Sequence, residues 1–68
     1  MEELANYLRI LQAKNFLTDT IWQILSLIGN SKDPQKALQV TTPVIESKIP
    51  ESEMTEAVRK MLMEKHLM

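Results

Sequence analysis

The side chains that most often carry out catalysis are sparse in this chain. His66 is the only histidine, and there is no cysteine. A histidine that acts as a general base needs a nucleophile and an orienting group within hydrogen-bond reach, and the neighbours of His66 supply neither at a recognisable spacing. A single histidine without cysteine cannot build a zinc site of the usual kind. We therefore interpret His66 as an exposed residue near a helix C-terminus, where its positive form suits the helix dipole.

Three carboxylates, Glu51, Glu53 and Glu56, follow Pro50 closely. Paired carboxylates can act as acid and base or hold a hard cation, but a calcium loop has a denser acidic pattern with a central glycine. The simpler interpretation is the first turn of a helix, where negative charge is favourable. GxGxxG, GxxxxGK[ST], HExxH and GxSxG are all missing, and one glycine cannot make a glycine-rich phosphate loop. We therefore expect no enzymatic activity, no metal and no cofactor.

The basic residues give limited support for nucleic-acid binding. Eight Lys and Arg oppose nine Asp and Glu, so long-range attraction of phosphate is not expected. A helix-turn-helix arrangement stays open, because Gln35, Lys36 and Gln39, with Lys32 beside them, could face a groove. No aromatic residue is interleaved with basic ones for stacking on bases. A small dimeric DNA-binding regulator is therefore the rival of the function proposed next.

Apolar side chains give the clearest indication of function. Four of the five methionines lie between residues 54 and 68, and methionine suits adaptable binding surfaces. Met63 and Leu67 fall beside the inward stripe of their predicted helix, where a second apolar strip could meet a partner helix. Trp22 is read either as core or as the centre of an interface, where tryptophan is enriched. The predicted protein-interaction residues are Trp22, Leu25, Met61, Met63 and Leu67.

Apolar periodicity and helix-terminating residues predict the elements that carry these side chains. Asn15 ends the first segment, Thr18 is expected to cap the second, and Gly29 to stop it. Asp33 followed by Pro34 is typical of a helix start, and a later proline, Pro43, should break or kink the third helix because it removes a backbone donor. The predicted helices span about 2–14, 18–28, 34–41 with 43–48, and 51–67.

These segments predict an all-α fold: one domain, 1–68, built as a small compact bundle of about four short helices, the third kinked or broken at Pro43. Trp22 and Leu27 widen the apolar surface of the second helix beyond one stripe. Such a helix should lie at the centre of the core or be partly buried in an interface. The first two helices could also be continuous, but the start signal at Thr18 favours a break.

The length of the chain bears on its oligomeric state and location. A core in fewer than about 70–80 residues seldom supplies more than about 3–5 kcal/mol, and here neither disulfide nor zinc can add to it. We therefore expect a homodimer, or a structural subunit of a larger assembly. The acidic opening Met1-Glu2-Glu3 and the short apolar run 21–28 resemble neither a signal peptide nor a membrane span, which favours the cytoplasm. The leading hypothesis is a regulatory or adaptor protein that binds another protein as an inhibitor, antagonist or assembly factor.

Overall fold

The computed structural model describes residues 2–68 and confirms the prediction of a small all-α bundle. Met1, the first residue of the predicted domain 1–68, lies outside the described residues. No strand occurs in the part of the chain that the structure describes. The four helices are α1 (Glu2–Ala13), α2 (Thr18–Gly29), α3 (Pro34–Glu46) and α4 (Glu51–Glu64).

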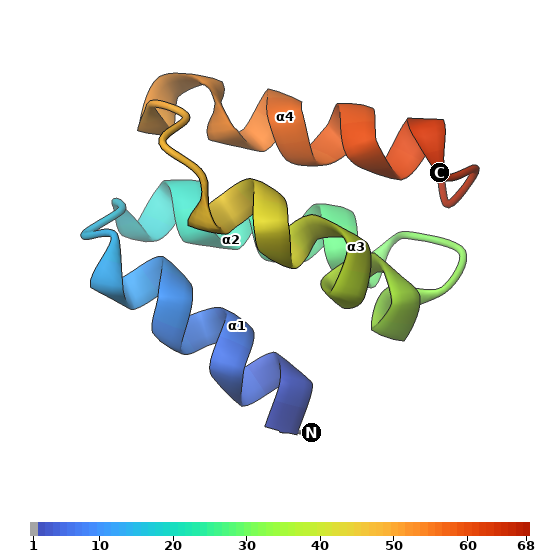
Figure 1. Cartoon of the computed structure of the whole chain (residues 1–68), viewed down its shortest axis with the longest axis horizontal. Helices are drawn as coiled ribbons and strands as arrows, with labels where there is room; N and C mark the ends of the chain where they lie inside the picture. Colours follow the sequence, from blue (N-terminus) through green and yellow to red (C-terminus); the bar gives the residue numbers. More distant parts are fainter. Residues whose placement is uncertain (1) are drawn as a thin grey trace.

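Helix α3 is the element on which the bundle is assembled. It packs against α1, α2 and α4, and α2 also packs along α4, whereas α1 makes its main contacts with α3 alone. Figure 1 shows α1 and α4 on opposite sides of α3, with α2 behind it. The second helix was expected either at the centre of the core or partly buried in an interface. The central position belongs to α3, and α2 keeps one surface in solvent.

The buried side chains come from all four helices and from the turn that follows α4. The core consists of Tyr7, Leu11, Ile24, Ile28, Ala37, Leu38, Ile45, Met54, Val58, Leu62 and Leu67. The accessible surface of 4586 Å² is close to the value of about 4,400 Å² expected for a folded monomer of this mass. The radius of gyration of 10.6 Å likewise matches the value of about 11 Å expected for a compact chain of this length. The single chain therefore buries as much surface as an ordinary small domain.

A buried hydroxyl pair fixes α1 against α3. The Tyr7 and Thr41 hydroxyl oxygens are 2.8 Å apart, and Tyr7 is 1% exposed. Thr41 donates its own hydroxyl hydrogen to the Ala37 carbonyl, at 2.6 Å, so the Tyr7 hydroxyl is the donor to Thr41. No buried side-chain polar atom of residues 2–68 lacks a partner. This pair therefore places polar groups inside the core without leaving a desolvated hydroxyl unpaired.

Helix α3 runs without interruption through Pro43, so the two separate pieces, 34–41 and 43–48, are wrong. The proline cannot donate to the Gln39 carbonyl four residues earlier, but both residues are exposed and water can take that bond. Buried residues on both sides of the proline, Thr41 and Ile45 among them, hold the helix on the core. Packing therefore outweighs the local cost of about 3 kcal/mol. The Thr42 hydroxyl, next to the proline, donates to the Leu38 carbonyl at 2.7 Å within the same helix.

The structure confirms some of the predicted helix caps and ends. Asp33 caps α3, since its carboxylate accepts the Lys36 backbone N–H at 3.2 Å. Asn15 ends α1 in the left-handed conformation, with φ of 60°. The expected Thr18 cap is wrong: Leu17 occupies the N-cap position without a side-chain bond, and Thr18 is already helical. α2 ends at Gly29 as predicted, but this glycine does not have positive φ, so its flexibility is not needed there.

Candidate protein-interaction surfaces

Trp22 lies on the outside of α2, with 64% of its surface exposed. The next residue, Gln23, faces α4, where its side-chain oxygen accepts a hydrogen bond from the Thr55 hydroxyl at 3.2 Å. Successive residues of a helix are turned by about 100°, so Trp22 points away from α4. The indole is therefore available to a binding partner and contributes little to the core of the single chain.

Four residues form a strip along this side of α2, which we call the α2 strip: Thr18, Trp22, Leu25 and Gly29. Their spacing of four, three and four residues places them on one face, as in the seam of a coiled coil. Leu25 is partly buried against the core, whereas the other three are exposed. A Cβ added to Gly29 would meet nothing within 4 Å, so there is open space above this end of the strip. The only charged residue of α2 is Asp19.

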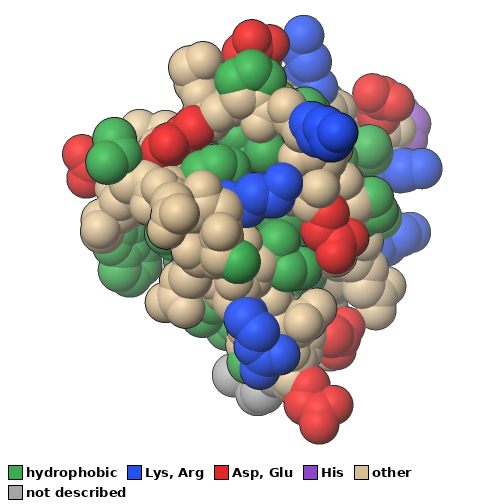
Figure 2. Space-filling view, turned by 60° about the vertical axis from the view of Figure 1, so that its left-hand side comes forward, with side chains coloured by type: hydrophobic (Ala, Val, Ile, Leu, Met, Phe, Trp, Pro, Cys, Tyr) green, Lys and Arg blue, Asp and Glu red, His purple; other side chains and the backbone are tan. Residues whose placement is uncertain are grey.

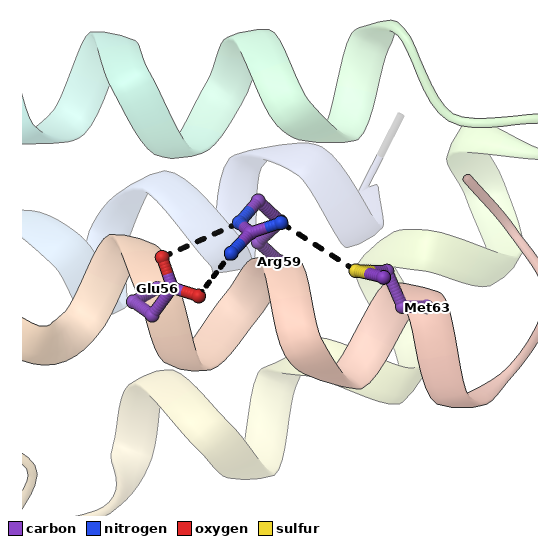
Figure 3. A network of polar contacts seen from close by, with 3 residues as sticks. All are labelled: Glu56, Arg59 and Met63. Carbon is purple, nitrogen blue, oxygen red and sulfur yellow. Dashed lines mark hydrogen bonds and ion pairs between the residues drawn. The ribbon is translucent and has the colours of Figure 1, made fainter.

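Met63 lies on a second exposed surface, on α4, with 54% of its area in solvent. Arg59 extends between Glu56 and Met63 along the outer side of the helix (Figure 3). Its Nε donates to Glu56 at 3.3 Å, a second nitrogen forms an ion pair with the same carboxylate, and the third lies 3.5 Å from the Met63 sulfur. The Arg59–Met63 surface, made of these three residues, thus combines a positioned guanidinium with a flexible apolar side chain. Both residue types are enriched in protein interfaces.

The α2 strip and the Arg59–Met63 surface are separate. Thr55 marks the side of α4 that meets α2, and Trp22 is turned away from the corresponding side of α2. The two surfaces therefore lie on different helices, and Trp22 faces away from the contact that joins these helices.

Leu67 is a correction to the predicted interaction residues, because it is buried, with 6% exposed. α4 ends at Glu64, earlier than predicted, and His66 adopts φ of 60°. The Leu67 N–H donates to the Leu62 carbonyl at 2.8 Å, and the His66 N–H to the Met63 carbonyl at 3.0 Å. These two bonds are those of a Schellman motif, which turns Leu67 back onto the core. The Leu67 carbonyl then accepts the Lys32 N–H at 2.6 Å.

The two remaining predicted residues lie between core and surface. Met61 is partly buried and follows the inward stripe of α4, beside Val58 and Leu62. Leu25 packs on the core with one side and borders Trp22 with the other. Of the five predicted interaction residues, Trp22 and Met63 are therefore exposed. Leu25 and Met61 are partly buried, and Leu67 is buried.

Leu17 lies at the loop end of the bundle and was not among the predicted interaction residues. Leu17 is 70% exposed beside two contacts that join the loops. Its N–H donates to the Glu51 carboxylate at 2.8 Å, and Lys14 donates to the Ser47 carbonyl at 2.8 Å. Figure 2 views this end, where hydrophobic side chains appear between separate basic and acidic groups. Leu17 occupies the N-cap position, before the first turn of α2, and therefore lies off the inward face of that helix.

The groups considered for catalysis or metal binding have structural contacts or stand alone. Among residues 2–68, no three His, Asp or Glu side chains gather where they could hold a metal ion. The Glu51 carboxylate accepts the Leu17 N–H, and Glu56 forms an ion pair with Arg59. Glu53 borders a shallow hollow of about 250 Å³. The hollow is lined by Ile49, Ser52, Glu53, Glu56, Ala57 and Lys60. His66 is exposed at the end of α4, away from this hollow.

The rival DNA-binding arrangement finds little support in the contacts of α3. The side-chain amides of Gln35 and Gln39 donate to the Glu3 carboxylate of α1, at 3.5 and 3.1 Å. These amides would have to read base edges, and instead they lie beside a carboxylate that would repel phosphate. Lys32 and Lys36 are exposed and remain the residues to test for this rival.

Comparison with known proteins adds no further constraint. The chain matches no protein-family model, no curated protein and no solved structure. No helix of residues 2–68 has both the length and the apolar content to cross a membrane.

Proposed function

We propose that this chain is a non-enzymatic regulatory or adaptor protein of the cytoplasm that binds another protein through exposed apolar helix faces, as a homodimer. The observation that carries the proposal is Trp22, a large aromatic side chain left 64% exposed at the middle of α2. Tryptophan is among the residues most enriched at the energetic centres of interfaces. An inhibitor, an antagonist and an assembly factor would all act by occupying a partner surface in this way.

The energetics of the fold support a binding role for Trp22. The core closes without the indole, and the surface of the chain has the extent expected of a monomer. Trp22 therefore adds little to folding, whereas burying an aromatic side chain in an interface removes a large apolar area from water. Met63 adds a second exposed apolar group, and its neighbour Arg59 is already held in position by Glu56. Less side-chain entropy is then lost when Arg59 binds a partner.

Site-specific photo-crosslinking in the native cell tests the proposal. A photoreactive amino acid is placed at Trp22, at Met63 and, as a control, at Lys36, which is exposed on α3. Adducts with a protein other than this chain, at one fixed mass and only from position 22 or 63, are the expected result. Equal labelling from all three positions, or adducts with this chain alone, would contradict binding of a different protein.

A further inference from the structure

We propose that the α2 strip is a self-association surface on which a second copy of this chain packs with its α2 antiparallel. The inference deepens the proposed function and rests on it for the role of Trp22. It assigns that surface to the homodimer and leaves the Arg59–Met63 surface free for a different protein.

The spacing of the α2 strip is self-complementary under twofold symmetry. When two α2 helices run antiparallel about a point between Gln23 and Ile24, Trp22 of each copy faces Leu25 of the other. Thr18 of each copy then faces Gly29 of the other. Large side chains meet at the centre and small ones at both ends, where the open space above Gly29 lets the backbones approach. An isologous interface requires this correspondence, in which each residue and its partner exchange places.

The charges around the strip favour the antiparallel direction. Asp19 lies in the first turn of α2, and the exposed Lys32 follows the end of the same helix. Antiparallel packing brings Asp19 of each copy to the end of α2 that Lys32 follows in the other. It also places the positive end of one helix dipole beside the negative end of the other. Parallel packing would instead bring Asp19 of both copies to the same end of the interface and align the two helix dipoles.

The size of the strip indicates a weak, reversible dimer. A helix of 12 residues is about 18 Å long, and a stable interface buries about 800 Å² on each partner. That area is roughly a sixth of the 4586 Å² surface of this chain. The strip must therefore be extended by its partly or fully exposed neighbours Ile21 and Leu17. Each chain folds on its own and pairs through a short contact.

Sedimentation equilibrium of matched variants tests which surface carries the dimer. Trp22→Ala should weaken dimerisation about 30-fold or more, as expected at an interface centre, with helicity unchanged. Met63→Ala, a change at a comparably exposed position on α4, should dimerise like the unchanged chain. A chain that stays monomeric at millimolar concentration would overturn the proposal. So would a dimer that Met63→Ala weakens and Trp22→Ala does not.

Cysteine pairing tests the direction of packing, because the chain has no native cysteine. Thr18 and Gly29 are 11 positions apart, or about 16 Å along the helix, which exceeds the Cα separation a disulfide can bridge. A mixture of Thr18→Cys and Gly29→Cys should give the mixed disulfide dimer, and Thr18→Cys alone should give little. Efficient pairing of Thr18→Cys with itself would overturn the antiparallel arrangement. Lys36→Cys controls for random collisions.

The two experiments separate this inference from the proposed function. If crosslinking from position 63 finds a different protein while the chain stays monomeric, the proposed binding role holds and the self-association fails. If Trp22→Ala abolishes a dimer and no other protein is captured, the self-association holds and the binding role fails.

Discussion

The buried hydroxyl pair of Tyr7 and Thr41 should make the stability of the protein depend on alkaline pH. Burial raises the pKa of Tyr7 from 10.0 to about 12. The folded pKa therefore lies above the unfolded one. The contribution to stability is complete below pH 10 and is lost as the pH rises through 12. A difference of about two units corresponds to about 3 kcal/mol of unfolding free energy.

Substitutions separate the hydrogen bond from the ionisation. Tyr7→Phe should cost about 1 kcal/mol at neutral pH, because Thr41 keeps its bond to the Ala37 carbonyl. Thr41→Val should cost more, about 2–3 kcal/mol, because it leaves the Tyr7 hydroxyl buried without a partner. In the double variant this penalty disappears, so its cost should be less than the sum of the two single ones.

Urea unfolding followed by circular dichroism, at neutral pH and from pH 10 to 12, measures these quantities. Tyr7→Phe removes only the phenol hydroxyl and leaves the other ionisable groups of the chain unchanged. Its loss of stability from pH 10 to 12 should therefore be smaller than that of the unchanged chain. Tyr7 is the only tyrosine, and its phenolate absorbance therefore reports its titration directly. Titration near pH 10, or equal pH dependence with and without the hydroxyl, would refute the buried pair.

Three further substitutions test helix ends by urea unfolding at low protein concentration. Gly29→Ala should stabilise the chain by about 0.5–1 kcal/mol, because this glycine is helical with open space around it; a loss would show that the helix end needs glycine. His66→Gly should stabilise by about 1 kcal/mol, since φ of 60° strains any other residue type, and an unchanged midpoint would argue against the turn after α4. Asp33→Ala should cost about 1 kcal/mol through loss of the α3 cap, whereas Asp33→Asn should retain most of the stability; equal losses would contradict the cap.

Local sequence signals were sufficient for the number of helices and most of their ends. Asn15, the Asp33-Pro34 pair and Pro50 mark boundaries through backbone chemistry that acts within a few residues. The buried positions of each helix also follow from periodicity, because a stripe of apolar residues has only one way to leave water.

The wrong predictions involve contacts between residues distant in the sequence. Pro43 does not break α3, because buried side chains on both sides of it hold the helix on three others. Leu67 is core because the turn at His66 returns the chain to the bundle, and no apolar pattern signals a left-handed histidine. Which helix is central depends on how the apolar stripes of the four helices pack against one another. The periodicity of a single helix does not determine this packing.

The candidate surfaces were predictable as residues but not as surfaces. Trp22 and Met63 were chosen for residue type and for their place off or beside an apolar stripe, and both are exposed. Their separation depends on how α2 and α4 are rotated against each other, a feature seen only through the contact of Gln23 with Thr55. The role of either surface in binding stays a prediction.

Trp22 is the only tryptophan, so its fluorescence tests the central claim, that the outer face of α2 is a binding surface, most directly. Emission and acrylamide quenching are recorded while the protein concentration is raised from nanomolar to millimolar. We predict red-shifted emission that acrylamide quenches readily at the lowest concentration, and a blue-shifted, protected indole at the highest. Blue-shifted, protected emission at every concentration would place Trp22 in the core, and water-like emission throughout would deny that a second copy covers it; either result contradicts the account.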